Sequence, residues 1–76
     1  MKSINDKEYI KIIKKLKAAR LAAGLTQVTL AKKLGVDQTF ISKYESRERR
    51  LDIIEVKKIC KGLKINFVDF VKEFDR

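Results

Sequence analysis

The chain has 76 residues, a hydrophobic fraction of 45% and a formal net charge of +9, with no proline, no histidine and one cysteine. This length predicts one domain, and the hydrophobic fraction excludes an intrinsically disordered chain. The lack of proline and the presence of only three glycines favour an all-α fold with short connections. The single cysteine excludes an internal disulfide, and no apolar run reaches membrane-spanning length, so we expect a cytoplasmic protein with no membrane partner.

The positive charge is concentrated in the first part of the chain. Residues 1–50 hold 13 basic and 5 acidic residues, whereas residues 51–76 hold 6 basic and 5 acidic residues. This asymmetry indicates one surface that faces a polyanion and another that serves a different purpose. The alternative is a generally lysine-rich soluble protein.

Five helices are predicted, and residues at their ends mark the boundaries. The first helix runs from residue 5 or 6 to Ala23, where apolar residues recur at steps of three and four. The second begins at Thr26, which is expected to be its N-cap, and ends at Gly35.

The remaining three helices are shorter and also begin at capping residues. The third covers residues 38–45 after Asp37, and a polar loop over residues 46–50 follows it. The fourth begins at Asp52, which has the spacing of a capping box with Glu55. Asn66 opens the last helix.

The segment 26–45 has the layout of a helix-turn-helix. Ala31 is a small residue where the two helices must cross closely, and Gly35 suits the positive φ that the turn needs. Further apolar residues are expected to fill the space beneath: Leu30, Leu34, Val36, Ile41 and Tyr44. The combined spacing indicates a unit that places its second helix in the DNA major groove.

From about Leu16 to Phe74 the chain resembles the phage repressor and Cro-like helix-turn-helix proteins, known as the XRE family. The resemblance is densest over four stretches: residues 24–27, 30–36, 38–45 and 49–55. It implies a single compact five-helix domain over residues 1–76. It also implies a repressor-like transcriptional regulator that binds a near-palindromic operator in double-stranded DNA as a homodimer.

The same resemblance implies roles for the polar residues of this unit. Gln27 matches a glutamine that binds a backbone phosphate and braces the next glutamine. Gln38 matches the first residue of the recognition helix, where an amide can donate to and accept from adenine. The other groove-facing positions are Thr39, Lys43 and, more weakly, Ser42.

An ion pair and a basic loop are expected to support this reading surface. Arg20 and Glu45 match a family ion pair that joins the first helix to the recognition helix. If it lies in the open, it stabilises the fold by no more than about 1 kcal/mol. Arg47, Arg49 and Arg50 are expected to contact DNA phosphates, which position a protein without reading sequence. For each of these residues, the alternative is an ordinary solvated side chain.

Three residues depart from the family pattern. Many relatives have glycine where this chain has Arg47, which predicts a turn of different shape, because arginine tolerates positive φ poorly. Relatives often carry glutamate at the position of Thr29, which predicts an incomplete capping box in the second helix. Phe40 is bulky for a rim position and is expected either to pack against the second helix or to lie against a sugar–phosphate.

The last helix is the expected dimer surface. Its apolar residues exceed what one short helix needs for its own packing: Phe67, Val68, Phe70, Val71 and Phe74. Together with the resemblance, they predict a dimerisation region over residues 52–76. The alternative is that they pack only within the core of one chain.

Two other classes of function compete with this interpretation. A protein-binding module, such as the antitoxin of a toxin pair, uses the same fold and would have a protein partner. Catalysis is not expected, since the chain has no histidine, no metal-ligand cluster and no glycine-rich phosphate loop. We therefore expect no catalytic residues, no metal and no cofactor.

Overall fold

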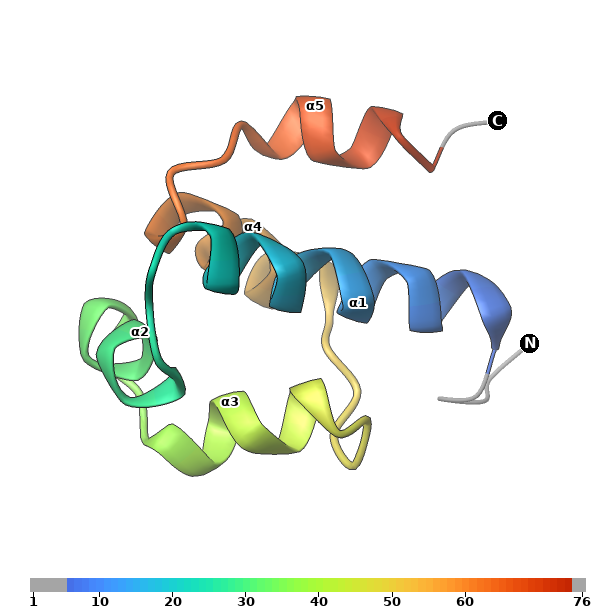
Figure 1. Cartoon of the computed structure of the whole chain (residues 1–76). Helices are drawn as coiled ribbons and strands as arrows, with labels where there is room; N and C mark the ends of the chain where they lie inside the picture. Colours follow the sequence, from blue (N-terminus) through green and yellow to red (C-terminus); the bar gives the residue numbers. More distant parts are fainter. Residues whose placement is uncertain (1–5, 75–76) are drawn as a thin grey trace.

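The computed structural model describes residues 6–74, which form five α-helices and no strand. The helices are α1 (Lys7–Ala22), α2 (Gln27–Leu34), α3 (Gln38–Glu45), α4 (Ile53–Gly62) and α5 (Phe67–Lys72). Figure 1 shows α3 and α5 on opposite sides of the molecule, with α1 and α4 between them. The predicted all-α, five-helix fold is confirmed. Residue 5, one of the two predicted starts of the first helix, lies outside the described residues.

Each helix begins directly after a side chain that accepts a hydrogen bond from a backbone N–H of its first turn. These N-caps are Asp6, Thr26, Asp37, Asp52 and Asn66. Such caps satisfy amides that have no partner inside the helix. They set the helix starts and therefore the positions of the side chains of α2 and α3.

The prediction of an incomplete capping box in α2 was wrong. The Thr26 hydroxyl accepts from the Thr29 amide at 3.0 Å, and the Thr29 hydroxyl accepts from the Thr26 amide at 2.8 Å. A threonine thus reaches back as a longer glutamate would, because the two residues lie within one helical turn. The box holds the start of α2, where Gln27 is the first residue.

The prediction of a different turn after α3 was also wrong. Arg47 adopts a φ of 65°, close to the 70° of Gly35 at the end of α2. The amide of Glu48 donates to the carbonyl of Lys43 at 2.8 Å, which closes the end of α3. The chain keeps the left-handed turn without glycine, at a cost of about 1 kcal/mol.

The core draws on all five helices and on the segment before α4. Its buried apolar residues are Ile13, Leu16, Leu30, Ala31, Ile41, Tyr44, Leu51, Ile59, Cys60, Leu63 and Phe70. Ala31 is 3% exposed where α2 packs on α3, as the helix-turn-helix spacing predicts. Val36 was predicted to be buried, but it is 38% exposed, because it lies in the turn rather than on a helix face.

Two further properties of the described part of the chain bear on function. Burial raises the pKa of the Cys60 thiol, so this cysteine acts as a small core residue rather than a nucleophile. Among residues 6–74, no helix is both long and apolar enough to cross a membrane.

Candidate nucleic-acid interface

A buried ion pair connects the end of α1 to the end of α3. Arg20 donates from Nε to Glu45 Oε2 at 2.7 Å and from Nη2 to Glu45 Oε1 at 3.0 Å. Its Nη1 donates to the carbonyl of Leu25 at 2.8 Å. The side chains of Arg20 and Glu45 are only 7% and 3% exposed. The guanidinium is therefore bound on both sides in a place with little water.

The ion pair that the sequence indicates is present, and it is buried rather than open to solvent, so the limit of about 1 kcal/mol for an exposed pair does not apply. The hydrogen bonds to Glu45 raise the pKa of Arg20, so the arginine stays charged. A buried pair of this kind gives little net stability compared with apolar packing, yet removing one partner leaves an uncompensated charge. The main consequence of this geometry is that Glu45 is held in one position.

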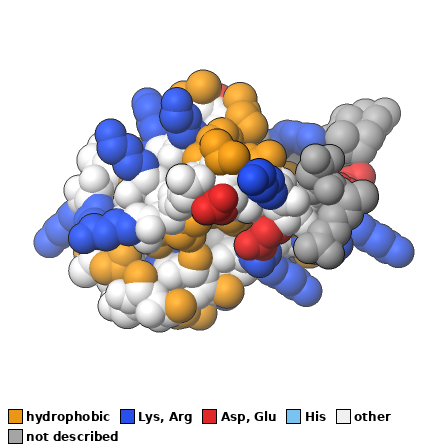
Figure 2. Space-filling model, turned by 90° about the horizontal axis from the view of Figure 1, so that it is seen from above, with side chains coloured by type: hydrophobic (Ala, Val, Ile, Leu, Met, Phe, Trp, Pro, Cys, Tyr) orange, Lys and Arg blue, Asp and Glu red, His pale blue; other side chains and the backbone are white. Residues whose placement is uncertain are grey.

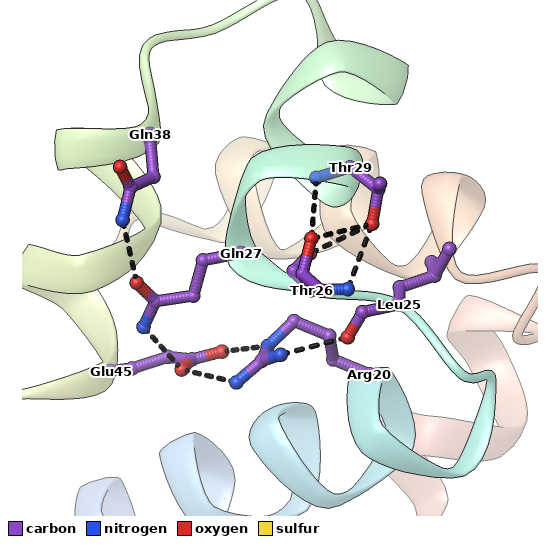
Figure 3. Close-up of polar contacts among 7 residues, drawn as sticks. All are labelled: Arg20, Leu25, Thr26, Gln27, Thr29, Gln38 and Glu45. Carbon is purple, nitrogen blue, oxygen red and sulfur yellow. Dashed lines mark hydrogen bonds and ion pairs between the residues drawn. The ribbon is translucent and has the colours of Figure 1, made fainter.

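Glu45 in turn orients two glutamines at the starts of α2 and α3. Gln27 Nε2 donates to Glu45 Oε1 at 3.0 Å, and Gln38 Nε2 donates to Gln27 Oε1 at 3.0 Å. Figure 3 shows the resulting chain of contacts from Arg20 through Glu45 and Gln27 to Gln38. We call these four residues the polar relay. It fixes which end of the Gln38 amide faces Gln27.

This orientation leaves Gln38 able to read a base. An amide has two N–H groups and one carbonyl, so one donation to Gln27 leaves an N–H and the carbonyl for an adenine edge. Gln38 is exposed, as are Thr39 and Lys43 on the same helix. Ser42 is half-buried, and its hydroxyl donates to the carbonyl of Thr39 at 3.3 Å.

The start of α3 is stabilised by a carboxylate. Asp37 accepts from the amide of Thr39 at 3.2 Å. Hydrogen bonds from the Thr39 backbone lower the pKa of Asp37, so this carboxylate is ionised at neutral pH. Its negative charge is then attracted to the positive N-terminal end of the α3 dipole.

The loop of residues 46–50, here called the arginine loop, lies between α3 and α4. Arg49 forms an ion pair with Glu55 of α4, and its guanidinium lies 5.0 Å from the centre of the Phe40 ring. The guanidinium of Arg50 lies 5.4 Å from the centre of the Tyr9 ring. Arg47 is half-buried beside α1. Two of the three arginines that were predicted to bind phosphates, Arg49 and Arg50, therefore lie against side chains of α1, α3 and α4.

Phe40 packs against the core, with its ring edge-on to that of Tyr44 at 5.6 Å. It lines a hollow together with Leu34 of α2 and Ile59 of α4. Of the two alternatives for this residue, the structure shows packing inside the chain. Its ring also supports Arg49.

Tyr9 is a residue that sequence reasoning missed. Its hydroxyl accepts from the amide of Leu51 at 3.1 Å and donates to the carbonyl of Arg49 at 3.3 Å. In the sequence, Tyr9 looks like one more apolar residue of the first helix. Nothing in the neighbouring residues predicts that its hydroxyl contacts residues about forty positions away. Only the packing of α1 beside the arginine loop brings them together.

The α5 face on the opposite side is apolar. Val68 and Val71 are 59% and 41% exposed, and they line a groove with Phe67, Lys72 and Phe74. Figure 2, which views the molecule from the α5 side, shows hydrophobic side chains gathered on this face with Lys and Arg side chains around them.

Phe70 does not belong to this exposed face, so its assignment to the dimer surface is corrected. It is 5% exposed and packs in the core, with its ring 5.3 Å from that of Phe74. On so short a helix, one side must attach to the rest of the molecule, and Phe70 provides that attachment. Of the other four residues, Val68 and Val71 are exposed, whereas Phe67 and Phe74 are half-buried and pack against the core.

The described residues contain no group of three or more His, Cys, Asp or Glu side chains that could hold a metal ion. The arrangement offers instead hydrogen-bond donors and acceptors on one exposed helix, with cationic side chains beside it. These groups can form hydrogen bonds and ion pairs with a polar, negatively charged partner.

Comparisons with known proteins agree with this geometry. Residues 16–70 match the family model HTH_3, described as helix-turn-helix. An XRE-family-like protein from Pseudomonas syringae pv. tomato str. DC3000 is 39% identical, with a TM-score of 0.89 over 95% of this chain and 88% of that chain. No curated protein sequence matches the chain.

A second solved structure is the wild-type restriction-modification controller protein C.Esp1396I. It is 34% identical, with a TM-score of 0.84 over 93% of this chain and 91% of that chain. The same controller protein, as a tetramer in complex with its natural 35 base-pair operator, has a TM-score of 0.83 at 34% identity. That match covers 93% of both chains.

Proposed function

The chain belongs to the XRE family of helix-turn-helix DNA-binding transcription regulators, and we propose that it binds a near-palindromic operator as a homodimer. In this proposal α3 lies in the major groove. Gln38, Thr39 and Lys43 read base edges there, and Ser42 is a weaker reader.

The observation that carries this proposal is the polar relay. A side chain that reads a base must present its donor and acceptor in one orientation, because a rotated amide would offer them in the wrong places. Gln38 is held through Gln27 and Glu45 by a buried arginine. An ordinary solvated glutamine at a helix start needs no such support, so the relay favours the reading role.

Phosphate contacts are assigned to Gln27, Arg47, Arg49 and Arg50, which lie beside the reading helix. Contacts of this type release counterions from DNA, so affinity is expected to fall steeply as salt concentration rises. They set the position of α3 on the duplex without selecting a sequence.

The homodimer is supported by the exposed apolar residues of α5. Val68 and Val71 project from a helix whose other side is already packed in the core. The controller protein C.Esp1396I, which has the same fold, forms a tetramer on its natural operator. Two copies of this chain would place their recognition helices about one DNA turn apart, roughly 34–36 Å.

Selection of bound sequences from random duplex DNA tests the proposal. The expected result is a palindromic site whose half-sites are separated by about one helical turn. Enrichment of a single half-site would contradict the homodimer and leave the reading role intact. Recovery of no preferred sequence would contradict base reading by α3.

A further inference from the structure

The arginine loop is fastened to α1 by one hydroxyl group. Tyr9 Oη accepts from the Leu51 amide at 3.1 Å and donates to the Arg49 carbonyl at 3.3 Å. These two backbone groups lie on either side of Arg50, so the hydroxyl bridges the end of the loop. Leu51 is 8% exposed and belongs to the core, which makes it a firm point of attachment.

The same tyrosine also supports an arginine side chain. The guanidinium of Arg50 lies 5.4 Å from the centre of the Tyr9 ring, while that of Arg49 lies 5.0 Å from the centre of the Phe40 ring. Each guanidinium thus rests on an aromatic face, one from α1 and one from α3. Such contacts attract cations and restrict their movement.

Order in this loop matters for binding a polyanion. Residues 46–50 are not helical, and an arginine loses much conformational freedom when it is fixed against a phosphate. A loop already held in place loses less on binding. Tyr9 is half-buried, and both its hydroxyl and its ring contact this loop. Packing of α1 in the core would not by itself require these contacts.

We propose that Tyr9 is a positioning residue for DNA binding, which holds Arg49 and Arg50 of the arginine loop ready to contact phosphates. The proposal rests on the proposed function, because it takes the loop to face DNA. Tyr9 acts through the arginines and makes no contact with DNA itself.

The central experiment replaces Tyr9 with phenylalanine, which removes the hydroxyl and keeps the ring. Affinity for a random-sequence duplex and for a selected operator is measured well below the unfolding midpoint of each variant. We expect Tyr9→Phe to weaken both by the same factor, about threefold to tenfold, because the loop must then be ordered on binding. Unchanged affinity would overturn the proposal.

Tyr44→Phe is the matched control. It removes the same atom from a buried tyrosine whose hydroxyl has no hydrogen-bond partner among residues 6–74. We expect its DNA affinity to equal that of the wild type. A loss equal to that of Tyr9→Phe would mean that any tyrosine hydroxyl matters, which would overturn the proposal.

A double-mutant cycle separates positioning from direct contact. In an Arg49→Ala/Arg50→Ala background, Tyr9→Phe should change affinity by less than about twofold, since the groups it positions are gone. If the full loss persists in that background, Tyr9 contacts DNA on its own and the proposal fails. Wild-type protein that binds no duplex DNA would refute the proposed function and the present proposal together.

A measurement on the wild-type protein remains decisive even if Tyr9→Phe does not fold. In the absence of DNA, the Leu51 amide should exchange its hydrogen much more slowly than an unprotected amide, because Tyr9 holds it. Exchange at the unprotected rate would show that the loop is not ordered before binding, and the proposal would fail.

Discussion

The α3 side and the α5 side of this molecule both expose side chains, but they do so in opposite ways. At α3 the exposed groups are polar, and Gln38 is connected through hydrogen bonds to the buried Arg20–Glu45 pair. At α5 the exposed side chains include two apolar ones, Val68 and Val71. A surface that recognises a pattern must hold its polar groups still, whereas an apolar surface is stabilised by being covered. The difference fits the proposal that one face binds DNA and the other binds a second copy of the chain.

The largest effect is expected when the buried ion pair that supports the polar relay is broken. Glu45→Ala leaves the charge of Arg20 buried without its partner, and we expect the free energy of unfolding to fall by about 3–5 kcal/mol. Urea denaturation measures the change. Glu48→Ala, an exposed glutamate in the arginine loop, is the control and should shift stability by no more than about 0.5 kcal/mol.

If the Glu45→Ala variant does not fold, a second variant that also removes the charge of Arg20 still tests the role of the pair. The double variant Arg20→Met/Glu45→Leu replaces the pair by apolar groups and should recover most of the lost stability. It should still bind operator poorly, since Gln27 has lost its acceptor. Full stability in Glu45→Ala would show that the pair is not buried in the manner described.

The second test introduces charged side chains into the apolar face of α5. Val68→Glu/Val71→Glu places two like charges on the proposed interface, and we expect the dimer dissociation constant to rise by about a hundredfold or more. Sedimentation equilibrium measures it. Val28→Glu, at a valine of α2 that is 46% exposed, is the matched control and should leave the oligomeric state unchanged. Wild-type protein that stays monomeric at all concentrations would contradict the assignment.

The third test concerns reading alone. Gln38→Ala should reduce discrimination between the operator and a variant base pair by about 1–3 kcal/mol, because the amide that meets the base edge is gone. Affinity for random duplex DNA, which depends on phosphate contacts, should barely change. Titrations with matched and mismatched duplexes provide both values. An equal loss on every sequence would move Gln38 to the group of phosphate-binding residues.

The smallest expected effect concerns the cap of α3. The pKa of Asp37 is lowered in the fold by hydrogen bonds from Thr39, so its stabilising contribution is complete at pH values above its ordinary pKa of about 3.8. That contribution is lost as pH falls through the lower folded value. Between pH 5 and pH 2 the free energy of unfolding should fall more for the wild type than for Asp37→Asn. Parallel curves would contradict the role of this carboxylate.

Features that depend on neighbouring residues could be predicted from the sequence. An N-cap and the amide it accepts from lie within three positions of each other, so all four predicted caps from Thr26 to Asn66 are confirmed. Thr29, in place of the usual glutamate, still completes the capping box of α2, because its hydroxyl oxygen lies within hydrogen-bond distance of the Thr26 amide. The capping box was predicted to be incomplete because residue 29 is not a glutamate, whereas the box requires only an acceptor within hydrogen-bond distance of the Thr26 amide.

Features that depend on distant packing could not be predicted. Arg20 and Glu45 are 25 positions apart, and their burial follows from how α1 crosses α3. The residue spacing on α5 does not reveal that Phe70 turns inward while Val68 stays outside. The positive φ of Arg47 was missed for a different reason: the backbone hydrogen bonds that close this turn are local and do not depend on the side chain, so they form with arginine as well as with glycine.

The five helices and the helix-turn-helix unit follow from the amino-acid sequence, and the sequence also supplies the candidates that are proposed to read DNA. These features depend on residues that are close together in the chain: helix caps, helical periodicity and a small residue where two helices cross. They can therefore be predicted from short stretches of sequence. Three features depend on how the helices pack: the burial of the ion pair, the orientation of Gln38 through that pair, and the attachment of the arginine loop to Tyr9. Those properties arise where segments far apart in the chain exclude water together, because burial determines whether a polar group is held or solvated.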